Sequence, residues 1–147
     1  MARKLTREQS FKLYPWQERK YTMKYCETDG GRSEYYRGTK NGDCVIRALA
    51  IGTGTDYKQV WQELCDMSKQ SGFFMNEKPV FSRYLRERGF TEHKLPKPWK
   101  SVDRLMLKDA IVYVRAGYGT HLTAVANGNL HDTWDCRDRL AYSYWTR

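Results

Sequence analysis

The pattern of hydrophobic and polar positions changes its period once along this chain, close to residue 108. Before that point, three apolar segments have the spacing and the end signals of helices. The expected helices run from Cys44 to just before Gly52–Gly54, from a cap at Thr55 or Asp56 through Tyr57, Val60, Trp61 and Leu64, and from a cap at Asn76 to about Arg88. A short strand at Phe90–Leu95 and one or two helical turns at Ser101–Leu107 follow.

After residue 108 the period becomes 2, which is typical of half-buried strands. The expected strands are Ala110–Arg115, His121–Ala126, Leu130–Trp134 and Leu140–Trp145. Turns are expected between the first two strands at Gly117–Gly119 and after the second at Asn127–Asn129, which is a strong hairpin signal. Helices followed by an antiparallel meander predict an α+β domain.

The segment from Met1 to Tyr36 shows neither period and is expected to be an extension that packs on, or docks beside, a domain formed by residues 37–147. The chain has 147 residues and a net charge of +9. Residues 1–24 hold seven Lys or Arg and two Glu, a net +5, so the charge predicts a basic arm that engages nucleic acid or an acidic protein partner. No helix-turn-helix, zinc-finger or RNA-recognition signature accompanies it.

No apolar run approaches the roughly 18 residues of a membrane-spanning helix, and residues 1–20 lack the apolar core of a secretory signal. The expectation is a cytoplasmic protein that has no membrane partner. In the cytoplasm the four cysteines are read as free thiols. Neither a cofactor nor a metal is expected, since a zinc site from Cys136 with His131 and another cysteine has no recognised spacing.

Cys44 is the thiol whose local context favours reactivity. In the first turn of a helix it meets unpaired backbone N–H groups and the positive end of the helix dipole, which favour the thiolate. The adjacent Asp43 carboxylate opposes ionisation, so a positive partner is needed. Arg47, one turn later, either aids thiolate formation, binds a substrate carboxylate or forms a structural salt bridge. The alternative is that Cys44 is only a small buried residue of an apolar helix.

His121 is the candidate partner, because an imidazole is unexpected at the start of a strand of small and apolar residues. Either two-residue loop in the following hairpin places side chains 121, 123 and 125 on one face with 130, 132 and 134. Asp132 then lies on the face of His121. A three-residue loop would present His131 and Asp135 instead, because a slip of one residue turns every side chain over.

A cysteine at a helix start with His and Asp on adjacent strands is the arrangement that nucleophilic thiol catalysis needs. The run Asn41–Ala48 (NGDCVIRA) resembles the nucleophile segment of papain-like cysteine peptidases, and locally the Asp-Gly-Asn-Cys-Leu-Phe-Arg-Ala signature of ovarian-tumour-type deubiquitinases. Gly119–Val125 and His131–Asp135 resemble the His and Asp/Asn strands of that superfamily. Together with Asp29–Arg32 and the ending Asp132–Cys136, these motifs are most similar to a family of uncharacterised phage and bacterial proteins.

The resemblance implies a papain-like fold and cleavage of a peptide or isopeptide amide through an acyl-enzyme. It makes Cys44 the nucleophile, His121 the general base and acid, and Asp132 the orienting residue. The glutamine that papain places six residues before the cysteine is Gly38 here, so the oxyanion falls to the Cys44 amide with another amide of the Asn41–Asp43 turn, or to the Asn41 side chain. Deamidation or transglutamination with the same residues stays open, as does a catalytically silent papain-like binding protein.

Overall fold

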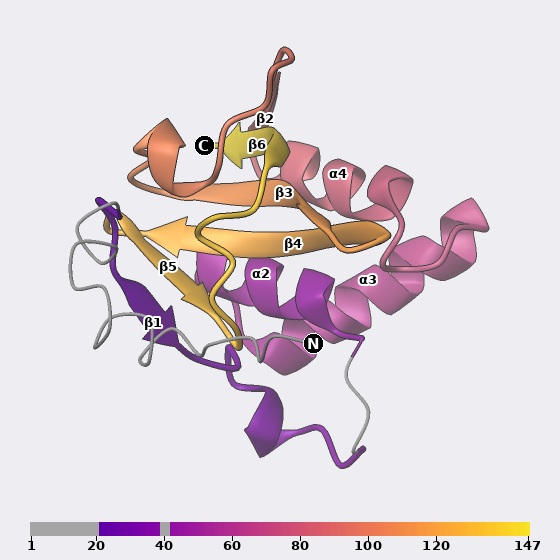
Figure 1. The fold of residues 1–147 in the computed structure, drawn as a ribbon. Coiled ribbons are helices and arrows are strands. Elements are labelled where there is room, and N and C mark those ends of the chain that lie inside the picture. Colours follow the sequence, from indigo (N-terminus) through magenta and orange to yellow (C-terminus); the bar gives the residue numbers. More distant parts are fainter. Residues whose placement is uncertain (1–20, 39–41) are drawn as a thin grey trace.

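The computed structural model describes residues 21–38 and 42–147, and within them the chain forms an α+β structure in which helices lie against a six-stranded sheet (Figure 1). The elements follow the chain in the order β1 (Tyr25–Glu27), η2 (Arg32–Glu34), α2 (Cys44–Thr53), α3 (Tyr57–Ser71), α4 (Lys78–Glu87), β2 (Thr91–Lys94), η3 (Asp103–Leu105), β3 (Ala110–Ala116), β4 (Gly119–Ala126), β5 (Asn129–Asp132) and β6 (Ala141–Thr146). Helices precede the meander, as the change of period predicts.

The helix ends follow from local chemistry. The Asp56 carboxylate caps α3, because it accepts hydrogen bonds from the amides of Lys58 and Gln59 at 3.1 and 3.4 Å. α2 ends where Gly54 adopts a left-handed conformation (φ 70°), which costs glycine little. The cap of α4 was predicted wrongly, since Glu77 and not Asn76 stands at its N-cap position. α4 has a proline in its first turn, where the missing backbone N–H costs no intrahelical hydrogen bond.

The sheet has the strand order β1-β5-β4-β3-β6-β2 and is mixed. The expectation of a purely antiparallel sheet was wrong for one pair: β1 runs parallel to β5, with Tyr25 opposite Leu130 and Glu27 opposite Asp132. This strand lies within the segment expected to be an extension, so the described part of that segment contributes an edge of the sheet. Residues 1–20, on which most of the basic-arm prediction falls, lie outside the described residues.

Each face of the sheet has its own apolar core. The helices pack on the face that presents Ile111, Leu122 and Trp145 (Figure 1). On the other face, β3, β4 and β5 present valine and leucine side chains that pack against Met23 and Val102. Gly52 of α2 lies so close to Ile111 that an added Cβ would be 2.4 Å from its Cγ1. α2 therefore lies directly on the sheet, which sets the position of its first residue, Cys44.

Within residues 21–38 and 42–147, no helix is both long enough and apolar enough to cross a membrane.

Candidate active site

His121 and Asp132 form a buried hydrogen-bonded pair. Nε2 of His121 lies 2.6 Å from Oδ2 of Asp132, and the two residues are 7% and 3% exposed. The hairpin register explains why they meet: Ala126 is opposite Asn129, so Asn127 and Gly128 form a two-residue loop. The predicted shared face of His121 and Asp132 is confirmed.

The register also excludes the alternative that His131 and Asp135 share the face of β5 on which Asp132 lies. The imidazole of His131 lies on the opposite side of β5, where its Nε2 is 3.2 Å from the carbonyl oxygen of Ala126. The ladder between β4 and β5 ends at Ala124 opposite His131, and the strands then diverge (Figure 1). Asp132 follows directly after this ladder, so its carboxylate stands where the two strands open toward α2.

The pair is electrostatically coupled. Burial by itself lowers the pKa of His121, but the hydrogen bond with Asp132 and further interactions with two thiols raise it above its ordinary value. Burial by itself raises the pKa of Asp132, yet its bond with His121 holds that pKa below its ordinary value. Both directions favour an imidazolium beside a carboxylate.

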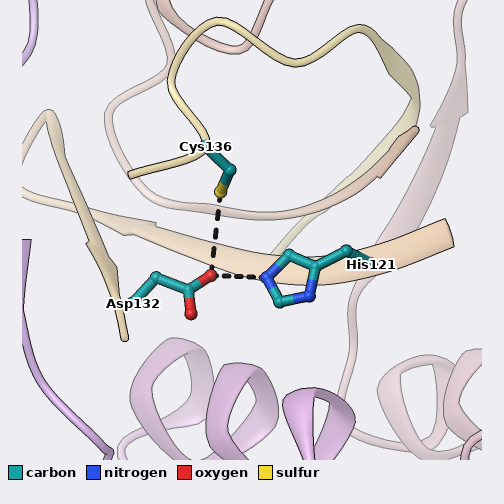
Figure 2. A group of neighbouring side chains, drawn as sticks. All are labelled: His121, Asp132 and Cys136. Atoms are coloured by element: carbon teal, nitrogen blue, oxygen red, sulfur yellow. Dashed lines mark hydrogen bonds and ion pairs between the residues drawn. The ribbon is translucent and has the colours of Figure 1, made fainter. Parts of the chain in front are cut away.

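Cys44 approaches this pair from the helical side. It is the first residue of α2, as predicted, and it is half-buried against β4. Burial by itself raises the pKa of its thiol, but hydrogen bonding with the His121 side chain and with the backbone of Leu122, together with the charges of His121 and Arg47, lowers it below the ordinary value. Nδ1 of His121 points away from Asp132 and Cys136, so it is free of that pair (Figure 2).

Asp43, expected as an auxiliary residue beside the nucleophile, has its carboxylate fully engaged. Oδ2 accepts a 2.8 Å hydrogen bond from the Tyr57 hydroxyl, and Oδ1 accepts from Arg47 and, at 3.3 Å, from Arg32. Asp43 stands at the N-cap position of α2, but its side chain makes no capping hydrogen bond. The opposition to thiolate formation expected from Asp43 is therefore balanced by two guanidinium groups.

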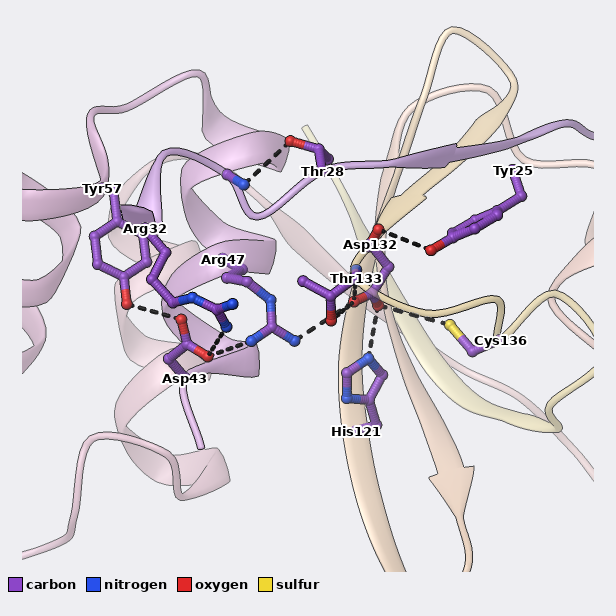
Figure 3. Close-up of polar contacts among 11 residues, drawn as sticks. Tyr25, Thr28, Arg32, Asp43, Arg47, Tyr57, His121, Asp132, Thr133 and Cys136 are labelled. Carbon is purple, nitrogen blue, oxygen red and sulfur yellow. Dashed lines mark hydrogen bonds and ion pairs between the residues drawn. The ribbon is translucent and has the colours of Figure 1, made fainter. Parts of the chain in front are cut away.

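Arg47 connects the two halves of the site. Its Nη1 bonds Asp43, and its Nη2 lies 3.5 Å from Oδ1 of Asp132, a residue 85 positions away along the chain. Figure 3 shows the guanidinium between the two carboxylates. Arg47 is only 5% exposed and forms the structural ion pair, and its charge also helps to lower the pKa of Cys44.

Trp134 covers the His121 ring, with the two ring centroids 4.9 Å apart and the planes tilted by 54°. An aromatic ring at this distance limits the access of water to the imidazole and to its bond with Asp132. In such a low-dielectric setting a charged hydrogen bond is stronger than it is in water. The two-residue hairpin loop predicts that Trp134 lies opposite His121, and the rings are in contact although the ladder ends at Ala124 opposite His131.

Cys136 also contacts the pair, a role that the sequence did not predict. Its Sγ lies 3.7 Å from Oδ2 of Asp132 (Figure 2). Burial is the main reason that the pKa of the Cys136 thiol is raised, although its interaction with His121 opposes the shift. A fully buried thiol with a raised pKa is a poor nucleophile, which distinguishes Cys136 from Cys44.

His121, Asp132 and Cys136 offer possible ligand atoms that lie within 4.8 Å of one another. Two ligands of one tetrahedral zinc ion lie about 3.3 Å apart, given metal–ligand bonds of about 2.0–2.1 Å. The 2.6 Å between Nε2 of His121 and Oδ2 of Asp132 is shorter than this and is a hydrogen-bond distance. The described geometry is thus that of a proton-sharing pair and does not fit a metal centre.

The expected oxyanion groups are only partly described. Asn41 lies outside the described residues, and Gly38 is the last described residue before that gap. The first-turn amides of α2 donate no hydrogen bond to the Asp43 side chain. The backbone N–H of Cys44 and its neighbours thus lie at the positive end of α2, beside the thiol.

Comparisons with protein-family models, with curated proteins and with solved structures gave no match to this chain.

Proposed function

We propose that this protein is a papain-like thiol hydrolase that cleaves a peptide or isopeptide amide through an acyl-enzyme. The observation that supports this most directly is the arrangement of Cys44, His121 and Asp132. The thiol at the start of α2 interacts with an imidazole that is hydrogen-bonded at 2.6 Å to a buried carboxylate. A nucleophile, a base and a group that orients the base are the three parts of such a mechanism.

The first step begins from the Cys44 thiolate and the His121 imidazolium. The sulfur attacks the carbonyl carbon of the substrate, and the carbonyl oxygen becomes an oxyanion. The amide of Cys44 and other amides of the α2 first turn supply donors to this oxyanion. The C–N bond then breaks as the imidazolium gives its proton to the leaving amine, leaving a thioester on Cys44 and a neutral imidazole.

The second step returns the enzyme to its starting state. His121 takes a proton from a water molecule, whose oxygen attacks the thioester carbonyl. Collapse of this intermediate releases the carboxylic acid and the Cys44 thiolate, and His121 again carries a proton. Asp132 fixes the imidazole throughout by its bond with Nε2, which leaves Nδ1 available for the interaction with the thiol. Use of an amine in place of water would give acyl transfer with the same residues.

The test compares Cys44 with other thiols of the same molecule. Cys26 and Cys65 are half-buried as Cys44 is, and they form a matched internal control. The full chain is treated with a peptide vinyl sulfone, and adducts are located by peptide mass spectrometry at pH 6. We expect labelling at Cys44 at least about tenfold faster than at Cys26 or Cys65, because a thiolate is the reactive form.

Variants assign the roles. Cys44→Ala should abolish this labelling. His121→Gln and Asp132→Asn should slow it, since the first removes the imidazolium beside the thiolate and the second removes the carboxylate that stabilises the imidazolium. Cys65→Ala should leave it unchanged. Equal labelling of the three half-buried cysteines, or labelling that is indifferent to His121→Gln, would overturn the proposal and favour a catalytically silent binding protein.

A further inference from the structure

We propose that Arg47 is a positioning residue for this site, whose guanidinium fork bridges Asp43 and Asp132 and so fixes the helix of the nucleophile relative to the strand of the orienting carboxylate. This inference rests on the proposed function and adds to it a residue outside the set of Cys44, His121 and Asp132.

Arg47 links two elements that the sheet does not join. Cys44 belongs to α2 and Asp132 to β5, and the backbone hydrogen bonds of the sheet do not join these two elements. Beyond Ala124 opposite His131, the ladder also stops holding β5 to β4. Arg47 lies one helical turn after Asp43, and its second terminal nitrogen reaches Oδ1 of Asp132 at 3.5 Å. The guanidinium thus supplies a link from α2 to the end of β5.

The two oxygens of the Asp132 carboxylate have different partners. Oδ2 accepts from His121, while Oδ1 faces Arg47 and accepts a 2.6 Å bond from the amide of Thr133. A carboxylate held at both oxygens cannot rotate, so the lone pair directed at the imidazole stays in place. The arginine suits this role because its planar fork presents two N–H groups in a fixed geometry.

Arg47 is itself held in place by its neighbours. Asp43 holds its Nη1, while Tyr57 and Arg32 hold Asp43, so the bridge extends to α3 and to η2 (Figure 3). The same contacts keep the Asp43 carboxylate off the first-turn amides of α2. An aspartate at an N-cap ordinarily occupies those amides. Their availability to an oxyanion therefore depends on the cluster around Asp43.

The groups that face Arg47 and the thiol come from several elements. They are Asp43 at the N-cap of α2, Arg32 of η2, Tyr57 of α3, His121 of β4, Asp132 of β5 and Cys136 after β5. Loss of the Arg47 charge and loss of its hold on Asp132 act in the same direction on Cys44, because both make the thiolate less favourable.

The experiment measures the rate of Cys44 alkylation by iodoacetamide against pH, in the full chain, with the adduct located by mass spectrometry. Arg47→Met keeps the length of the side chain without charge or fork. We expect its midpoint to shift upward by about one pH unit, which gives roughly tenfold slower alkylation at pH values below both midpoints. The matched control is Arg88→Met, which also breaks an ion pair, the one with Glu63, but far along the chain from the site. It should leave the midpoint unchanged.

Arg47→Lys keeps a positive charge beside the two buried carboxylates but loses the guanidinium fork that contacts both. This variant therefore folds even if the buried carboxylates require a cation. One ammonium cannot span both carboxylates, so we expect the midpoint to be restored only in part. Full restoration by lysine, or an unshifted midpoint in Arg47→Met, would overturn the positioning role while leaving the proposed function intact. A wild-type Cys44 that titrates like a free thiol would instead overturn the proposed function, and this inference with it.

Discussion

The Tyr57 hydroxyl donates a 2.8 Å hydrogen bond to Oδ2 of Asp43, which joins the first turn of α3 to the residue immediately before the nucleophile. Tyr57 is 2% and Asp43 9% exposed, so bulk water does not replace this hydrogen bond if either partner is removed. This hydrogen bond therefore affects both the stability of the packed helices and the electrostatics of the site.

Removal of this hydroxyl should destabilise the protein. In Tyr57→Phe a buried carboxylate oxygen loses its donor, and hydrogen bonds to charged groups contribute about 1.5–3 kcal/mol. We expect the free energy of unfolding in urea to fall by about that amount. Tyr113→Phe is the control, since the Tyr113 hydroxyl bonds Thr120 at an exposed position. A loss no larger in Tyr57→Phe than in Tyr113→Phe would contradict the prediction.

The pH dependence of stability should reveal the ion pair of Cys44 and His121. Above pH 6.5 the folded imidazole keeps a proton that the unfolded one has lost, because its interactions outweigh burial and raise its pKa. This makes stability fall by up to about 1.4 kcal/mol per pH unit as the pH rises. Cys44 acts oppositely up to its unfolded value of 9.0, since the folded thiol has the lower pKa. Between the folded pKa of Cys44 and pH 9.0, the two slopes cancel.

Cys44→Ala removes the compensating group, so just below pH 9.0 its unfolding free energy should decline with pH more steeply than that of the wild type. Urea unfolding at several pH values measures both slopes. In the double variant Cys44→Ala with His121→Gln the additional slope should disappear. Parallel profiles for wild type and Cys44→Ala would show that the folded site holds no imidazolium–thiolate pair.

Trp134 should maintain the raised pKa of His121 by excluding water from the bond with Asp132. Trp134→Ala opens that bond to solvent, and in water a charged hydrogen bond is weaker. We expect the pKa of His121, followed by NMR titration of its ring protons, to move down toward 6.5, the ordinary value. Trp134→Phe retains a ring and should keep most of the shift. An unchanged titration in Trp134→Ala would remove this role from the tryptophan.

Gly52 should be sensitive to a single added methyl group. Alanine is the better helix former by about 1 kcal/mol. However, its Cβ would lie 2.4 Å and 2.6 Å from Cγ1 and Cδ1 of Ile111, a fully buried side chain. Overpacking of this kind costs about 1–3 kcal/mol, so we expect Gly52→Ala to lower the melting temperature. Ile111→Val, which removes the Cδ1 atom, should recover part of the loss in the double variant, and its failure to do so would locate the strain elsewhere.

The sequence by itself determined the local parts of the site. The apolar run after Gly42 identified the helix that begins at Cys44, and the alternation around Asn127–Gly128 placed His121 and Asp132 on one face, because the period of a strand is 2 and the loop length sets the parity. These features depend on residues close together in the chain. The pairing of β1 with β5 has no such signal, so the sheet was expected to be antiparallel.

Only the tertiary structure decided how these parts meet. Arg47 and Asp132 are 85 residues apart, and Cys136 reaches Asp132 from a loop. Such contacts depend on where α2 lies on the sheet and on where β5 diverges from β4, and the periodicity of neither segment determines that. Periodicity predicts the face on which a side chain lies, but the distance between groups on different elements follows from packing. The fully engaged carboxylate of Asp43, which the sequence placed only beside the thiol, is a result of that packing.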